Sequence, residues 1–412
     1  MPILHRTRTL PALLPRYVGR FACIGPACED NCCTGWQVQI DKKTYKAYRQ
    51  AGDSRLGTLL ATHVVRQRGQ PGDLDYGRIE LDPASAACPI LQERLCAVQS
   101  TLGESYLSHT CFSYPRMSRD FGGQFEQGMT LSCPETARLA LLAPDAFDFV
   151  QGTITVRTDV VDQVVARHGM TLEQMNDVRI FCLKLMRTEG VELWQKLAVL
   201  GVLCESLTGA LAQGKHAAIP ALLEDVATLV GNGQMRDALA DMPPNHAAQA
   251  MVFAALWGGK TSAAPSPAQR AVIGAIAEGL GADPATGSVT SEQLIERYTR
   301  GAGRLPEALA AAPHLLEHYI LNEMFSLLFP FDGADPYASY LQLVARFGLL
   351  RLMLAAQCNG DGALPDAAAL VGTVQVFCRR FQHDLTFAGQ VNQSLQNSGW
   401  STLEKLYGFL RS

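Results

Sequence analysis

Eight of the twelve cysteines in this 412-residue chain lie before residue 134, and this concentration limits the possible folds more than any other feature. The later four, Cys182, Cys204, Cys358 and Cys378, lie among apolar neighbours at helical spacing, as buried thiols do. The early ones lie near glycine, proline and asparagine residues, which favour turns and loops. They are Cys23, Cys28, Cys32, Cys33, Cys88, Cys96, Cys111 and Cys133.

The first four cysteines follow the pattern C-x4-C-x3-C-C within GRFACIGPACEDNCCTGW, a segment in which several thiolates can converge on one metal centre. Disulfides would need an oxidising compartment, and nothing in the sequence directs the chain to one. Zinc prefers C-x2-C knuckles, which this region lacks, although irregular zinc sites exist. Iron-sulfur clusters accept broader spacings and are favoured. We expect the adjacent Cys32 and Cys33 to serve different jobs or different sides of the site.

The composition predicts a soluble globular protein. Hydrophobic residues make up 48% and charged residues 18%, enough to build a packed core. The net charge of -4 gives no indication of binding to nucleic acid or to an anionic membrane. The start of the chain lacks the apolar segment of a secretion signal, and no uncharged stretch reaches the roughly 20 residues of a spanning helix. A cytoplasmic protein is therefore expected.

Apolar residues recur at three- and four-residue intervals in the later part of the chain, which predicts helices. Such stripes run over 178–186 and 193–207, from Pro313 to Pro330, and onward from Tyr340. Strand patterns are sparse, at 35–41 and 153–161. We therefore predict a mainly α fold: an irregular cysteine-rich metal-binding domain over 1–150 and a helical domain over 151–412. Segments GGKTSAAPSPAQ and GADPATGS predict a flexible insert near 259–290.

The sequence HLLEH at 314–318 fits the H-x-x-E-H pattern of a zinc peptidase. The surrounding helix is otherwise apolar and no third ligand is evident, so we interpret both histidines as ordinary helix residues. Nor does a glycine-rich turn after a strand mark the cofactor site of a Rossmann-like methyltransferase.

Three cysteine-containing segments bring a known family into consideration: FACIGPACEDNCCTGWQVQIDKKTY, CPILQERLCAVQSTLGESYLSHTCFSYPR and LSCPETARLALL. Together with EHYILNEMFSLLFPF at 317–331 and VFCRRFQHDL at 376–385, they resemble the flagellin lysine N-methylase family. That family lies within a cysteine-rich group described as zinc or iron chelators. The resemblance implies methyl transfer from S-adenosylmethionine to lysine side chains of flagellin by an enzyme with a 4Fe-4S cluster. All eight early cysteines match the family's cysteine pattern.

Methyl transfer to lysine requires a neutral amine, whereas the lysine side chain has a reference pKa of about 10.4. Near the cysteines, the candidate catalytic residues are Tyr106, Tyr114 and Glu135, and Arg116 or Arg138 are candidates for binding the donor's carboxylate. The ordinary alternatives are packed tyrosines with bonded hydroxyls and a glutamate in the first turn of a helix. Two rival functions stay open: a non-catalytic zinc or iron-sulfur module that serves as an interaction scaffold, and an electron carrier.

Overall fold

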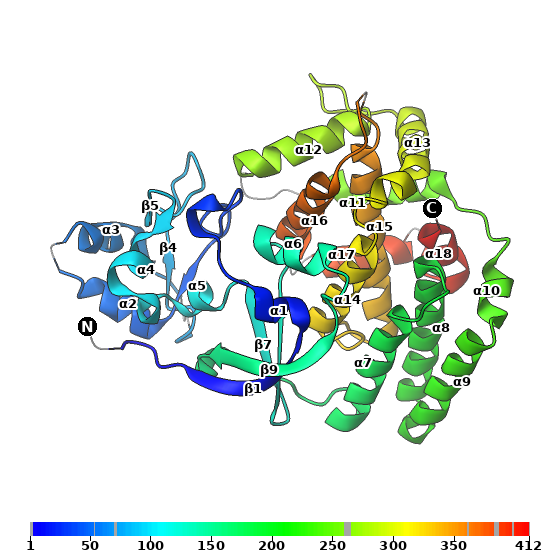
Figure 1. The fold of residues 1–412 in the computed structure, drawn as a ribbon, viewed down its shortest axis with the longest axis horizontal. Coiled ribbons are helices and arrows are strands. Elements are labelled where there is room, and N and C mark those ends of the chain that lie inside the picture. The colour runs from blue at the N-terminus through cyan, green and yellow to red at the C-terminus, as the bar shows by residue number, and fades with distance from the viewer. Residues whose placement is uncertain are drawn as a thin grey trace. The chain divides into compact units, whose positions relative to one another are not determined.

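The computed structural model describes residues 3–52, 54–69, 72–258, 265–360, 362–382, 387–397 and 399–411. The chain forms two compact units (Figure 1). We call the first the sheet unit; it comprises Met1–Leu139, Asp148–Val164 and Thr261–Ala271. The second, the helical unit, comprises Ala140–Phe147, Val165–Lys260 and Val272–Ser412. The boundary expected at residue 150 falls inside strand β9 (Phe149–Val156).

The larger sheet of the sheet unit has the strand order β10-β7-β8-β1-β9. Strand β1 (Arg8–Pro15) runs antiparallel to β9 and parallel to β8 (Gln124–Met129). Strand β7 (Arg116–Phe121) forms a hairpin with β8 and pairs with the short β10 (Asp162–Gln163). The hairpin turn consists of Gly122 and Gly123, both with positive φ, which glycine adopts without strain.

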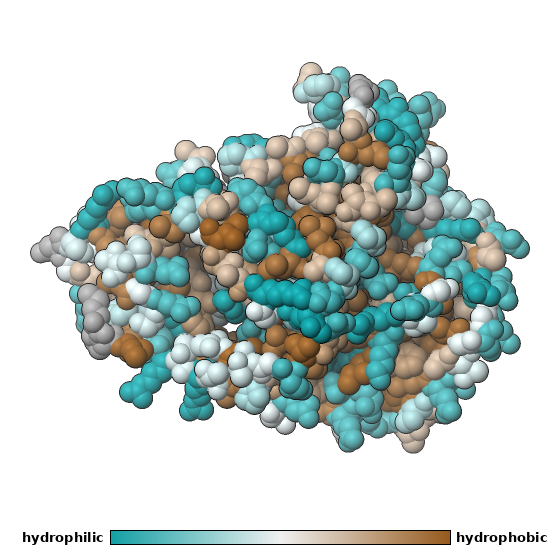
Figure 2. Space-filling model, viewed as in Figure 1, coloured by the Kyte–Doolittle hydropathy of each residue, from teal (hydrophilic) through white to brown (hydrophobic). Residues whose placement is uncertain are grey.

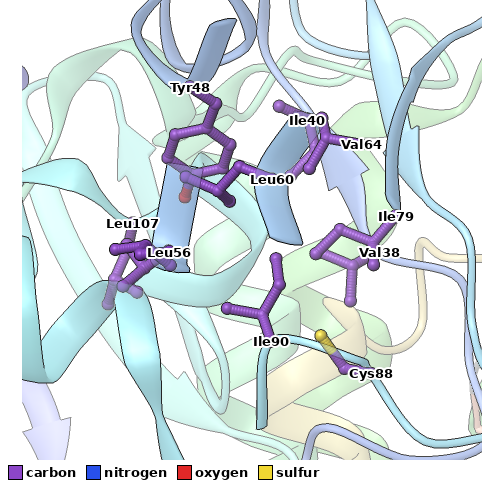
Figure 3. Packing of buried hydrophobic residues seen from close by; sticks show 11 residues of the cluster. Val38, Ile40, Tyr48, Leu56, Leu60, Val64, Ile79, Cys88, Ile90 and Leu107 are labelled. Atoms are coloured by element: carbon purple, nitrogen blue, oxygen red, sulfur yellow. The ribbon is translucent and has the colours of Figure 1, made fainter. Parts of the chain in front are cut away.

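Two small sheets and several short helices in the same unit enclose a second core of buried residues (Figure 3). Its apolar residues include Ile40, Leu60 and Val64, all fully buried, and Cys88 packs at its edge. The strands are β2 (Gln39–Ile40), β3 (Val64–Arg66), β4 (Gly77–Ile79), β5 (Leu91–Gln92) and β6 (Leu95–Cys96). The α-helices of the unit are α1 (Arg16–Arg20), α2 (Lys42–Arg49), α3 (Arg55–His63), α4 (Ala97–Leu102), α5 (His109–Ser113) and most of α6 (Pro134–Leu142). The cysteine-rich region is thus less irregular than its loops predict.

Helices build the rest of the chain, and the prediction of a mainly α protein is confirmed. In order they are α7 (Leu172–Met186), α8 (Leu193–Ala212), α9 (Ile219–Gly231), α10 (Gln234–Leu239), α11 (His246–Gly258), α12 (Pro267–Gly279), α13 (Ser291–Leu309), α14 (Leu315–Leu327), α15 (Pro336–Gln357), α16 (Ala367–Phe381), α17 (Phe387–Asn397) and α18 (Leu403–Leu410). The apolar stripes predicted α7, α8, α14 and α15. Thr171 and Gln174 form a capping box that begins α7.

Two helices, α8 and α15, are long and apolar enough in composition to cross a membrane. The most apolar window of α15 is 94% buried within the protein, as in the core helix of a soluble domain. On the face drawn in Figure 2, hydrophilic and hydrophobic residues are interspersed. Large apolar side chains that stay exposed, such as Leu74 and Met251, belong to separate segments.

A helix lies within the segment for which the composition predicts a flexible insert. Residues 267–279 form α12, with Ile276 fully buried, which corrects the expectation of a loop for them. Residues 259–264 lie outside the described part of the chain. In the sheet unit, the buried Gln269 amide donates to both carboxylate oxygens of Asp30, at 3.2 and 3.0 Å. The apolar spacing over 272–280 is helical, but the flanking small and turn-forming residues obscured it.

Candidate metal centre

The loop that carries Cys32 and Cys33 is fixed by backbone hydrogen bonds. The Asn31 side chain accepts from the amide of Cys33 at 2.9 Å, and the Trp36 indole donates to the carbonyl of Cys32 at 2.5 Å. The carbonyl of Cys33 accepts from the amide of Cys88 at 2.7 Å. This bond holds the loop against the segment that leads into the β5–β6 hairpin, where Leu91 pairs with Cys96.

Seven of the eight early cysteines influence one another electrostatically. A side-chain hydrogen bond with Cys32 is the largest cause that raises the pKa of Cys33. The expectation that the two serve different jobs or different sides of a metal site stays a prediction. The charge of Cys32 also acts on the pKa values of Cys28, Cys88, Cys96, Cys111 and Cys133. The set spans the loop, the hairpin, α5 and the start of α6. Cys23 is exposed, and these interactions do not include it.

Burial keeps Cys28, Cys88 and Cys111 protonated at neutral pH in the absence of a positive centre. It raises the pKa values of Cys28 and Cys88 to about 11 and that of Cys111 to about 12. A metal ion or cluster supplies the positive charge that stabilises clustered thiolates, and its binding releases their protons. These seven thiols exceed the four thiolates that one cluster or one zinc ion takes. Among the described residues, no three of their sulfur atoms lie within 4.8 Å of one another, so the thiols are neighbours but are not closed around one point.

A buried polar group supports the helix that carries Cys111. Within the described residues, His5, Asp41 and His109 are the one group of three ligand-type side chains whose donor atoms lie within 4.8 Å of one another. The Asp41 carboxylate accepts from the amide and hydroxyl of Thr44 at 2.9 and 2.7 Å and from the amide of His109 at 3.3 Å. Burial lowers the pKa of His5 to about 4. At neutral pH an ionised Asp41 and an uncharged His5 thus join the first described residues of the chain to α2 and α5.

The two tyrosines named as candidate catalytic residues lie on either side of α5. Tyr114 caps the end of α5, and its hydroxyl lies 3.1 Å from the hydroxyl of Ser132, the neighbour of Cys133. Its ring packs 5.5 Å from that of Trp36 in the cysteine loop. Tyr106 instead accepts, through its carbonyl, a hydrogen bond of 2.8 Å from the hydroxyl of Tyr48. Tyr114 is therefore held directly beside the cysteine-bearing segments.

The charged candidates differ in how they are engaged. The guanidinium of Arg138 lies between two carboxylates, 2.9 Å from Glu135 and 2.6 Å from Glu29. Arg116, at the start of β7, lies over the ring of Phe21 at 5.2 Å. The pair of Glu135 and Arg138 thus neutralises itself, whereas Arg116 forms no ion pair within the described residues.

Sequence reasoning missed a second arginine in this region. Arg157 follows β9 and is only 1% exposed, with its guanidinium 4.1 Å from the ring centre of Phe112. Its terminal nitrogens donate to the carbonyls of Leu107 and Glu104 at 2.8 and 2.9 Å. Because its burial arises from long-range packing, no local pattern around TVRTD distinguishes it from a surface arginine.

The HLLEH segment forms the N-cap and first turn of α14, and its side chains are engaged within the helical unit. Nδ1 of the buried His318 lies 2.8 Å from the carbonyl oxygen of Ala140, within the helical unit. Its ring stacks with that of His314 at 5.2 Å. The Glu317 carboxylate accepts from the Lys196 ammonium at 2.9 Å.

His318 should make the stability of the helical unit depend on pH. Burial lowers its pKa from 6.5 to about 4, so between these values the unfolded chain takes up a proton that the folded chain does not. Its contribution is thus complete above pH 6.5 and falls as the pH drops toward 4, by up to about 3 kcal/mol. His318→Asn, which retains a donor toward Ala140, should flatten this dependence in urea unfolding measured from pH 8 to 4. Parallel curves for variant and wild type would contradict the assignment.

Comparison with known proteins identifies the family. The model of the FliB lysine N-methylase C-terminal domain matches residues 179–409, more than half of the chain. The chain belongs to the FliB lysine N-methylase family. This match confirms the resemblance and covers α7–α18, whereas all eight early cysteines precede it.

Curated relatives of the family show similar agreement over shorter segments. A lysine-N-methylase of Salmonella typhimurium is 35% identical over 173 residues, which are 42% of this chain and 41% of the relative. The flagellar biosynthetic protein FliU of Salmonella muenchen is 38% identical over 133 residues, which are 32% of this chain and 78% of the relative. The alignment thus spans less than half of the lysine-N-methylase. No solved structure matches the chain.

Proposed function

We propose that this protein is a protein-lysine N-methyltransferase that transfers methyl groups from S-adenosylmethionine to lysine side chains of flagellin. The observation that carries the proposal is the match of residues 179–409 to the FliB lysine N-methylase domain. The names of the lysine-N-methylase and FliU relatives support the reaction and a flagellar substrate. The mildly acidic chain favours neither nucleic acid nor an anionic membrane as a partner.

A 4Fe-4S cluster is the proposed group at the cysteine centre, and zinc is the alternative. Its ligands would come from the set around Cys32, which comprises Cys28, Cys32, Cys33, Cys88, Cys96, Cys111 and Cys133. When bound, a cluster supplies an electron-poor centre that stabilises thiolates and polar ligands. A cytoplasmic location, which we also propose, would keep these thiols reduced and available.

The chain's own residues have to bind the donor and obtain a neutral amine. The target ammonium must lose a proton before nitrogen attacks the methyl carbon, the carbon–sulfur bond breaks, and the sulfonium becomes a neutral thioether. Tyr114 is the best placed of the three candidate bases, since its hydroxyl is hydrogen-bonded to Ser132 beside Cys133. The carboxylate of Glu135 is already engaged in an ion pair with Arg138.

The test is to purify the protein without oxygen, determine iron, sulfide and zinc, and incubate it with flagellin and S-adenosylmethionine carrying a labelled methyl group. The expected result is labelled methyl-lysine in flagellin, found by mass spectrometry of peptides. A matched control uses flagellin whose lysines have first been chemically dimethylated, which should accept little label.

The outcomes separate the rival functions. A fully metal-loaded protein that binds no S-adenosylmethionine and leaves flagellin unlabelled would contradict the methyltransferase. If the same preparation can be reduced and reoxidised, the result would favour an electron carrier. If it cannot, the result would favour a structural module. If zinc is the sole metal found and methyl transfer still occurs, the bound group is zinc and not a cluster. The proposed methyltransferase reaction would be unaffected.

A further inference from the structure

The sheet unit contains a small cavity whose polar lining comes from α5 and three strands. Its volume of about 20 Å³ admits one group of the size of a water molecule. Phe112 and three valines close its apolar side. Its polar residues are Ser113, Arg116, Ser118, Gln127, Thr155 and Arg157.

A buried nitrogen of Arg157 in the cavity lining lacks a hydrogen-bond partner. The two terminal nitrogens of the guanidinium donate to backbone carbonyls, but Nε has no acceptor and is inaccessible to solvent. Buried donors are nearly always paired, so an orphan beside a cavity indicates an acceptor that occupies it. The hydroxyl of Ser113 already donates to the carbonyl of His109, but the hydroxyls of Ser118 and Thr155 in the lining can donate to the same acceptor.

The charge of the lining favours an anion over water as that acceptor. Arg116 and Arg157 contribute two positive charges, and neither forms an ion pair with a carboxylate within 4.0 Å in the described part of the chain. Their cation–π contacts, with Phe21 and Phe112, leave both charges uncompensated at short range. Arg138, which holds two carboxylates, shows the opposite arrangement. A carboxylate oxygen matches the size, the charge and the donors.

The cavity also lies next to the cysteine centre. Phe112 and Ser113, two of its lining residues, directly follow Cys111 on α5. Burial lowers the pKa of Arg157, and the groups that raise it are Asp41, Glu104, Tyr48 and, last, Cys111. A ligand with its carboxylate in the cavity would therefore lie beside the cysteine-bearing helix.

We infer that this cavity, between Arg116 and Arg157, receives the carboxylate of the methyl donor. The inference rests on the proposed function, because it assumes S-adenosylmethionine as the ligand. It gives Arg116 and Arg157 the role of binding and orienting the donor, while the base acts elsewhere.

The test is a calorimetric comparison of two ligands on the metal-loaded protein: S-adenosylmethionine and its decarboxylated analogue, which lacks only the carboxylate. Arg116→Gln is the principal variant because Arg116 is less buried than Arg157 and its loss endangers folding less. Arg8→Gln is the matched control, since it removes the same charge from an exposed position on β1 of the same sheet.

Arg116→Gln should weaken binding of S-adenosylmethionine by about 10-fold to 100-fold, the range expected for a lost charge-assisted hydrogen bond. Its affinity for the decarboxylated analogue should stay within about twofold of wild type, and Arg8→Gln should change neither. Equal loss for both ligands, or none for either, would overturn the inference while the methyltransferase stands. Failure of the wild-type protein to bind S-adenosylmethionine would remove the proposed function and this inference together.

Discussion

Replacing Cys32 by serine should abolish incorporation of iron and sulfide, with loss of the visible absorption expected of a cluster. Ionised Cys32 would raise the pKa values of six other early cysteines, more than any other thiol in the region, so it is the first candidate ligand to test. A serine hydroxyl is a poor replacement because it is not ionised at neutral pH, whereas the metal requires a thiolate. The measurement is metal and sulfide analysis with absorption spectra after anaerobic purification.

Cys358→Ser is the matched control for this change. Cys358 is buried in the helical unit, where its thiol donates to the carbonyl of Leu354 at 3.4 Å, a bond that serine can keep. The control should bind as much metal as wild type. Full iron and sulfide in Cys32→Ser would show that Cys32 is not a ligand and would move the centre to other members of the set.

Gly301→Ala should destabilise the helical unit by about 1–3 kcal/mol, the usual cost of overpacking. Helix α13 passes α15 so closely at this position that an added Cβ would lie 2.1 Å from the carbonyl oxygen of Ala355. A backbone atom cannot rotate away as a side chain can, so the two helices would have to separate. The amide nitrogen of Asn359 would lie 3.0 Å from the same atom.

Gly303→Ala provides the comparison on the same helix, because no atom lies within 4 Å of a Cβ built there. Alanine should stabilise this exposed turn, by up to about 1 kcal/mol, through its higher helix propensity. In calorimetry, Gly301→Ala should therefore lower the melting temperature and Gly303→Ala should raise it, although the two glycine-to-alanine changes lie only two residues apart. Equal shifts would contradict the close helix contact.

The helices of the second unit were predictable because their signal is local. Apolar residues at three- and four-residue intervals mark α7, α8, α14 and α15. The pattern gave their positions, but α15 is buried on all sides over residues 339–356 and not on one face. Strand β1 was missed because Pro11 and Pro15 argue against a central strand. Pairing with β8 involves only Ala12 and Leu13, which follow Pro11, so that proline does not interrupt it.

The candidate site was predictable only as far as residue types reveal chemistry. Cysteines in loops indicate a metal centre whatever the fold, and seven of the eight influence one another in the structure. The engagement of Arg138 with Glu29 depends on residues 109 positions apart, and the burial of Arg157 depends on segments 50 and 53 positions away. Such distances leave no periodic trace in a sequence, so those roles emerge only from three-dimensional packing.

The pairing of β1 with β9 affects how the protein is made on the ribosome. Strand β1 can pair with β8 only after residue 124 has been synthesised, and with β9 only after residue 149. The contact between Gln269 and Asp30 forms later still. At ordinary translation rates, the wait between β1 and β9 is on the order of 10 s. During that interval the emerging thiols are accessible to oxidants and to free metal ions. Loading of the proposed metal is therefore expected late, once the sheet has closed.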